Sequence, residues 1–98
     1  MEDLATNIIE WIRLHKELFC SFEHVYLFGS VLKEDRKPND IDILIIYKHY
    51  SAQIGEKVKE IHEQMEQEYD LPVDISVLSV TEEIETGFLE RIVPYLEI

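Results

Sequence analysis

The run from Ile41 to Tyr47 constrains the fold of this 98-residue chain more than any other segment. Side chains on a strand alternate between the two faces of its sheet. Read as a strand, the run is apolar on both faces, with Ile41, Ile43, Ile45 and Tyr47 on one and Leu44 and Ile46 on the other. Such a strand is usually central in its sheet and covered by helices on both sides. The run therefore predicts a layered α/β fold.

Helix and strand patterns alternate along the rest of the chain. Apolar residues at helical spacing predict helices over residues 3 to about 20 and over residues 52–69. The β-branched and aromatic segments 24–28 and 73–78 predict two further strands.

The C-terminal part predicts a short helix and an edge strand. The helix is expected to begin near Thr81 or Glu82, with Ser79 and Glu82 spaced for a capping box and Gly87 able to divide it. Residues 93–98 could form a short edge strand, a position that Pro94 would suit. The order α-β-β-α-β-α, with this last strand, predicts a small mixed β-sheet flanked by helices, and residues 1–98 are expected to form a single domain.

Composition limits the classes of partner. The formal net charge of −12 opposes non-specific binding to nucleic acid or anionic lipid, and it is compatible with a basic protein partner or with divalent cations.

The single cysteine, Cys20, cannot form an internal disulfide. The N-terminus has no signal-peptide pattern, and no apolar run approaches the roughly 20 residues that span a bilayer. We therefore expect a cytoplasmic protein that needs neither a membrane nor direct contact with nucleic acid.

Three aspartates occupy strand positions where isolated carboxylates are costly. Asp40 and Asp42 are two residues apart on one strand, so their side chains share a face of the sheet. Asp74 lies on a later strand between the apolar residues Val73 and Ile75. Because neither strand holds a Lys or Arg, a hard divalent cation such as Mg²⁺ is the simplest partner for all three charges.

Gly29 and Ser30 end the strand 24–28 abruptly. A glycine there allows a positive φ and close approach of the backbone to a ligand. A helical turn starting at Ser30 would aim free N–H groups at a phosphate, and the Ser30 hydroxyl would add a donor. Lys33, one turn further on, would add positive charge. The segment thus predicts a triphosphate cradle beside the carboxylates.

These residues resemble a known motif set. The run Tyr26-Leu27-Phe28-Gly29-Ser30, then nine residues, then Asp40-Ile41-Asp42, with Asp74 on a later strand, is similar to the nucleotidyltransferase superfamily related to DNA polymerase β. The similarity is closest to its smallest members, the minimal nucleotidyltransferases of prokaryotes. It covers Val25 to Leu78, and the tail from Phe88 to Ile98 also resembles the ending of that family.

The resemblance implies roles for the same residues. Asp40 and Asp42 would hold two catalytic Mg²⁺ ions, and Asp74 would bind the ion that activates the attacking hydroxyl. Gly29 and Ser30 would bind the outer phosphates of ATP or another nucleoside triphosphate. The hydroxyl would attack the α-phosphate in line and release pyrophosphate.

The chain departs from the family pattern at three positions. Members often carry Arg where Lys33 stands, Gly where Glu34 stands and Ser where Asn39 stands. Lysine offers phosphate a single charge, whereas arginine offers a planar fork. None of the three changes removes a metal ligand, and they bear on turnover and on the choice of nucleotide.

The resemblance also implies a partner. Many such small proteins are encoded beside an all-helical protein of the HEPN class, and the pair resembles a toxin–antitoxin system. The nucleotidyltransferase is then the antitoxin and adds AMP to the toxin. The short chain lacks the helical substrate-binding domain of aminoglycoside-modifying and polymerase relatives, which favours acceptance by a separate HEPN-type chain.

Two other readings remain open at this point. The chain could modify a small molecule such as an aminoglycoside, with the acceptor site completed by a second subunit or a homo-oligomer to which the apolar tail contributes. It could also be a non-catalytic antitoxin that acts by binding. The intact set of three aspartates weighs against this last reading.

Overall fold

The protein forms a mixed sheet with helices on both of its faces. The structure is a computed structural model that describes residues 3–33 and 37–98, so that Glu34 lies outside the described residues. The described strands are β1 (His24–Phe28), β2 (Ile41–Tyr47), β3 (Val73–Ser79) and β4 (Tyr95–Glu97). Their order across the sheet is β3-β2-β1-β4. β2 runs parallel to β3, whereas β1 is antiparallel to both β2 and β4.

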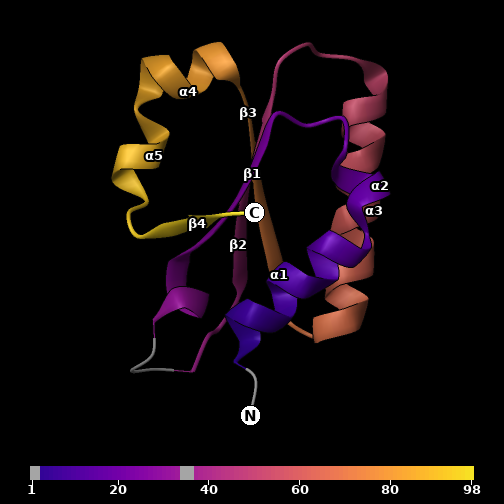
Figure 1. The fold of residues 1–98 in the computed structure, drawn as a ribbon, viewed down its shortest axis with the longest axis vertical. Helices are drawn as coiled ribbons and strands as arrows, with labels where there is room; N and C mark the ends of the chain where they lie inside the picture. The colour runs from indigo at the N-terminus through magenta and orange to yellow at the C-terminus, as the bar shows by residue number, and fades with distance from the viewer. Residues whose placement is uncertain (1–2, 34–36) are drawn as a thin grey trace.

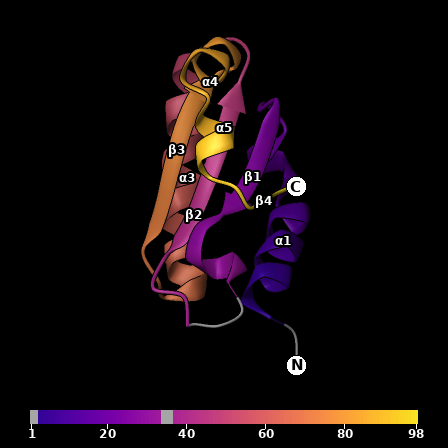
Figure 2. The ribbon, with the colours of Figure 1, turned by 90° about the vertical axis from the view of Figure 1, so that its left-hand side faces the viewer.

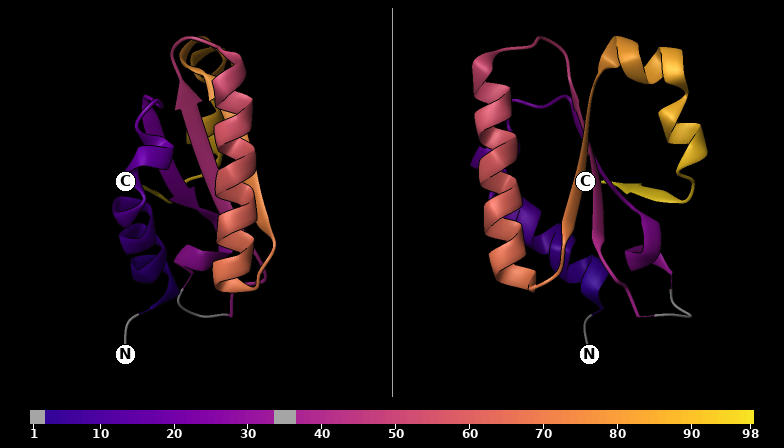
Figure 3. Two further views of the ribbon diagram at one scale, coloured as in Figure 1. Left: turned by 90° about the vertical axis from the view of Figure 1, so that its right-hand side faces the viewer. Right: turned by 180° about the vertical axis from the view of Figure 1, so that it is seen from behind.

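The helices divide into two layers (Figure 1). On one side of the sheet lie α1 (Leu4–Leu14), α2 (Lys16–Phe19) and α3 (Ala52–Tyr69), and on the other lie α4 (Val80–Thr86) and α5 (Phe88–Arg91). The views from the right-hand side and from behind show the same two layers (Figure 3). A single 3₁₀ turn, η1 (Gly29–Leu32), follows β1. No helix in the described part of the chain is long and apolar enough to cross a membrane.

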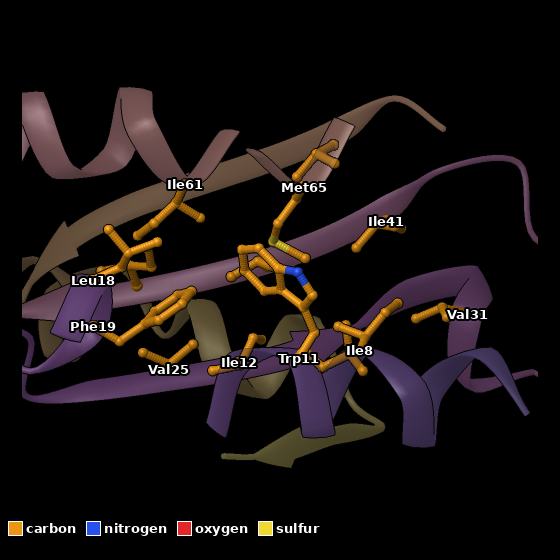
Figure 4. Close-up of a cluster of buried hydrophobic side chains, with 14 residues drawn as sticks. Ile8, Trp11, Ile12, Leu18, Phe19, Val25, Val31, Ile41, Ile61 and Met65 are labelled. Carbon is orange, nitrogen blue, oxygen red and sulfur yellow. The ribbon is translucent and has the colours of Figure 1, made fainter. Parts of the chain in front are cut away.

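β2 is buried on both faces, as its sequence predicts. Ile41, Ile43 and Ile45 belong to the larger core, which packs against α1, α2 and α3 (Figure 4). Leu44 and Ile46 belong to a smaller cluster with Tyr26, against which side chains of α4 and α5 pack. The predicted order of elements, the mixed sheet and the short C-terminal edge strand are confirmed.

The predicted single helix over residues 3 to 20 is wrong, because the chain breaks at His15 between α1 and α2. The His15 backbone N–H contacts the carbonyl oxygens of both Trp11 and Ile12, and its ring Nδ1 lies 2.8 Å from the Trp11 carbonyl oxygen. The imidazole also stacks on the Trp11 ring, with centroids 4.0 Å apart. These local contacts replace the regular helical pattern, and α2 then turns Leu18 and Phe19 into the core.

The predicted capping box sets the start of α4. The Glu82 N–H donates to the Ser79 hydroxyl oxygen at 3.0 Å, and the Ser79 N–H donates to the Glu82 carboxylate at 2.8 Å. Gly87 ends α4 with a φ of +63°, a conformation that L side chains rarely adopt. The chain therefore turns there, and α5 comes back along the sheet instead of extending α4 (Figure 1).

Candidate active site

Strand register brings the three predicted aspartates together. Asp42 in β2 is the direct partner of Asp74 in β3, and Asp40 lies immediately before the first residue of β2. One carboxylate oxygen from each of Asp40, Asp42 and Asp74 lies within 4.8 Å of the others. The connection through α3 places β3 parallel beside β2, which is what makes the pairing possible. Three oxygen donors thus converge on one point.

The cluster lies on the face of the sheet that carries α4 and α5. Asp42 alternates with Ile41 and Ile43, which point into the larger core, so its side chain projects from the opposite face. Figure 2 shows α4 over the far end of this face and α5 between α4 and β4, while η1 lies near the start of β2. Asp40 and Asp42 are partly buried, and Asp74 is exposed. The carboxylates are therefore open to a ligand approaching that face.

The electrostatics of Asp42 indicate a cation site. Burial, followed by the negative charges of Asp40 and Asp74 and a hydrogen bond with Asp40, raises the pKa of Asp42 from 3.8 to about 6. Each of these causes disfavours the ionised carboxylate. A divalent cation among the three oxygens would supply the missing opposite charge, and an all-oxygen carboxylate set suits Mg²⁺. The donor set therefore fits the metal that the sequence predicts.

Gly29 makes room for the Asp42 carboxylate. Its φ is +84°, and a Cβ placed on it would collide with Oδ2 of Asp42 and lie 3.0 Å from its Cγ. Phe28, immediately before Gly29, is the antiparallel partner of Asp42 in the register of β1 and β2. The sequence predicts Gly29 as a phosphate contact but gives no sign of this second role, because the contact depends on strand register. A glycine is required here whether or not a nucleotide is bound.

The residues predicted to bind phosphate divide into two groups. Ser30 lies beside the carboxylates, and its hydroxyl donates a hydrogen bond to Oδ1 of Asp40 at 3.4 Å. Lys33 instead lines a surface hollow with Leu4 of α1 and Leu96 of β4, and none of the three aspartates lines that hollow. The structure therefore brings Gly29 and Ser30 to the carboxylates, whereas the contact of Lys33 with phosphate stays a prediction.

Binding of a divalent metal is expected to depend on pH. Because Asp42 holds a proton below about pH 6 in the metal-free protein, the metal must displace that proton to bind there. The apparent affinity for Mn²⁺, used as a spectroscopic substitute for Mg²⁺, should fall about tenfold for each pH unit below that value. Titrations followed by electron paramagnetic resonance at several pH values test this expectation. An affinity that stays constant between pH 7 and pH 5 would contradict it.

The chain matches one protein family over nearly its whole length. The family model described as "Polymerase beta, Nucleotidyltransferase" matches residues 7–94. The matched region includes Gly29, Ser30 and all three aspartates. Comparisons with curated proteins and with solved structures give no significant match.

Proposed function

The chain belongs to the polymerase β-type nucleotidyltransferase family, and on this premise we propose that it transfers AMP from ATP to a hydroxyl group of a protein partner. The observation that carries the proposal is the convergence of three carboxylate oxygens within 4.8 Å, beside a glycine that leaves them space. Two Mg²⁺ ions, when bound, would stabilise the charge on the entering and leaving oxygens. In this proposal Asp40, Asp42 and Asp74 are the metal ligands.

The side chains suggest how the reactants are arranged. The Gly29-Ser30 turn would hold the outer phosphates, and the α-phosphate would then lie near Asp40 and Asp42. Asp74 is the exposed member on the neighbouring strand β3, so the acceptor would approach from its side. The acceptor oxygen then forms a bond to the α-phosphorus while the bond between that phosphorus and the bridging oxygen breaks. Pyrophosphate leaves, and Asp74 takes the proton of the hydroxyl.

Two properties of the chain support a protein acceptor. Asp74 is exposed, which leaves its carboxylate accessible to a residue on the surface of another protein. The net charge of −12 would attract a basic partner and speed its association. Together with the resemblance to minimal nucleotidyltransferases, this favours a helical partner of the HEPN class, with the chain as the antitoxin of the pair.

Incubation with the product of the adjacent gene tests the proposal. The purified pair, supplied with Mg²⁺ and ATP, should give a partner whose intact mass has risen by one AMP unit. The same mixture with EDTA should give no increase. An unmodified partner that is nevertheless neutralised, equally well by the Asp42→Asn variant, would contradict transfer and favour an antitoxin that acts by binding. Modification of an aminoglycoside, with the partner protein left unmodified, would show that the acceptor is a small molecule.

A further inference from the structure

α5 places an arginine and a phenylalanine on the same face of the sheet as the carboxylates. The Phe88 ring meets the Phe28 ring edge to face, with centroids 6.1 Å apart. The guanidinium carbon of Arg91 lies 5.7 Å from the centroid of the Phe88 ring. Phe28 is in turn the strand partner of Asp42. A continuous row of side chains therefore leads from the carboxylates to Arg91.

Arg91 has no acidic partner within the described parts of the chain, although the protein carries 21 Asp and Glu residues. The side chain is exposed, and its guanidinium carbon lies over the Phe88 ring, a contact that does not use the hydrogen-bond donors of the guanidinium. Because Gly87 breaks the helix, Arg91 lies on a short helix that turns back along the sheet. The position thus offers a flat cationic surface to a ligand on this face.

The layout of the proposed reaction leaves one direction for the nucleobase. The outer phosphates lie at the turn after β1, and the acceptor approaches along β3, at the far edge of the sheet. The direction away from both leads along β1 toward α5, the helix that carries Phe88 and Arg91 (Figure 2). Nucleobases stack well on aromatic rings and on guanidinium planes.

We propose that Arg91, held by Phe88, forms the binding site for the nucleobase of the triphosphate. This inference rests on the proposed function, since it concerns the nucleotide used in that reaction. The guanidinium stacks on the base, and Phe88 is the positioning residue that keeps its plane parallel to the base.

Calorimetric titration with ATP and with tripolyphosphate, both with Mg²⁺, tests the proposal without relying on turnover. Arg91→Ala should weaken ATP binding about tenfold, the loss expected for one stacking contact, and should leave tripolyphosphate binding unchanged. Arg91→Lys keeps the charge but loses the plane, so it should weaken ATP binding as much as Arg91→Ala does. Arg13→Ala is the matched control, because Arg13 is an exposed arginine of α1, in the other helical layer.

Each other outcome overturns the nucleobase site. Wild-type affinity for ATP in Arg91→Ala shows that the guanidinium does not contact the nucleotide. An equal loss for ATP and tripolyphosphate, or recovery by Arg91→Lys, shows that it acts as a general positive charge. Failure of the wild-type protein to bind ATP overturns AMP transfer itself, and the base site with it. Loss of transfer in Asp42→Asn with normal ATP affinity in Arg91→Ala contradicts the base site alone.

Discussion

Asp42→Asn is expected to reduce AMP transfer by about a thousandfold or more. The substitution keeps the size of the side chain but removes the charge at the centre of the carboxylate cluster. Metal ions contribute several kcal/mol to the stabilisation of a transition state, and each 1.36 kcal/mol is a factor of ten in rate. The rate of AMP incorporation, measured at saturating Mg²⁺ and ATP, tests this expectation. Transfer within tenfold of the wild-type rate would remove Asp42 from the site.

Asp70→Asn is the matched control for that substitution. Asp70 is exposed at the C-terminus of α3, with a φ of +53° that asparagine also tolerates. The substitution makes the same change of charge four residues before Asp74, at a carboxylate that does not belong to the cluster of three. We expect its transfer rate to equal that of the wild-type protein.

The Asp42→Asn variant should also show how much the ionised Asp42 carboxylate destabilises the metal-free protein. The unfolded chain releases the Asp42 proton near its ordinary pKa of 3.8, whereas the metal-free folded protein retains it up to about pH 6. The contribution of this group to stability is therefore greatest below pH 3.8 and is lost as the pH rises through about 6. Above that pH, Asp42→Asn should melt at a higher temperature than metal-free wild-type protein. Added Mg²⁺ should stabilise the wild-type protein more than the variant.

Gly29→Ala is expected to lower transfer about a hundredfold. The new Cβ would collide with Oδ2 of Asp42, so the carboxylate would have to move away from the other two. A displacement of about 1 Å in a catalytic group can cost about a hundredfold in rate. The affinity of the protein for Mn²⁺ should fall as well, because one of its three oxygen ligands is displaced. Both quantities can be measured on the same preparation.

Gly87→Ala separates this steric effect from backbone strain. Gly87 also has a positive φ, but the nearest atom to a Cβ there is Oε2 of Glu90 at 3.9 Å, an ordinary contact. Both alanine variants should lose stability, by about 1 kcal/mol, from the left-handed backbone. Only Gly29→Ala should lose Mn²⁺ affinity. An equal loss of Mn²⁺ binding in both variants would contradict the steric role of Gly29.

The predictable parts of the site are those that follow from local periodicity. Asp40 and Asp42 share a face because strand side chains alternate, and Asp74 joins them because a helix between two strands favours parallel neighbours. The apolar pattern of β2 likewise predicts a central strand with a core on each side. These rules depend on residues close together in the chain, so one sequence is enough to apply them.

The parts that could not be predicted depend on contacts between distant residues or on local competition. The close approach of the Asp42 carboxylate to Gly29 depends on the register of β1 against β2, which alternation alone does not give. The break at His15 requires its ring to compete for the Trp11 carbonyl, a contact that helical periodicity does not register. The approach of Phe88 to Phe28 depends on the turn at Gly87 and on how α5 then packs.

A crystal structure of the protein with Mn²⁺ and a non-hydrolysable ATP analogue tests the central claim most directly. The account predicts anomalous scattering peaks for Mn²⁺ bound by carboxylate oxygens of Asp40, Asp42 and Asp74, with the outer phosphates of the analogue at the Gly29-Ser30 turn. Mn²⁺ peaks elsewhere in the molecule, with no metal at these three side chains, would contradict the account.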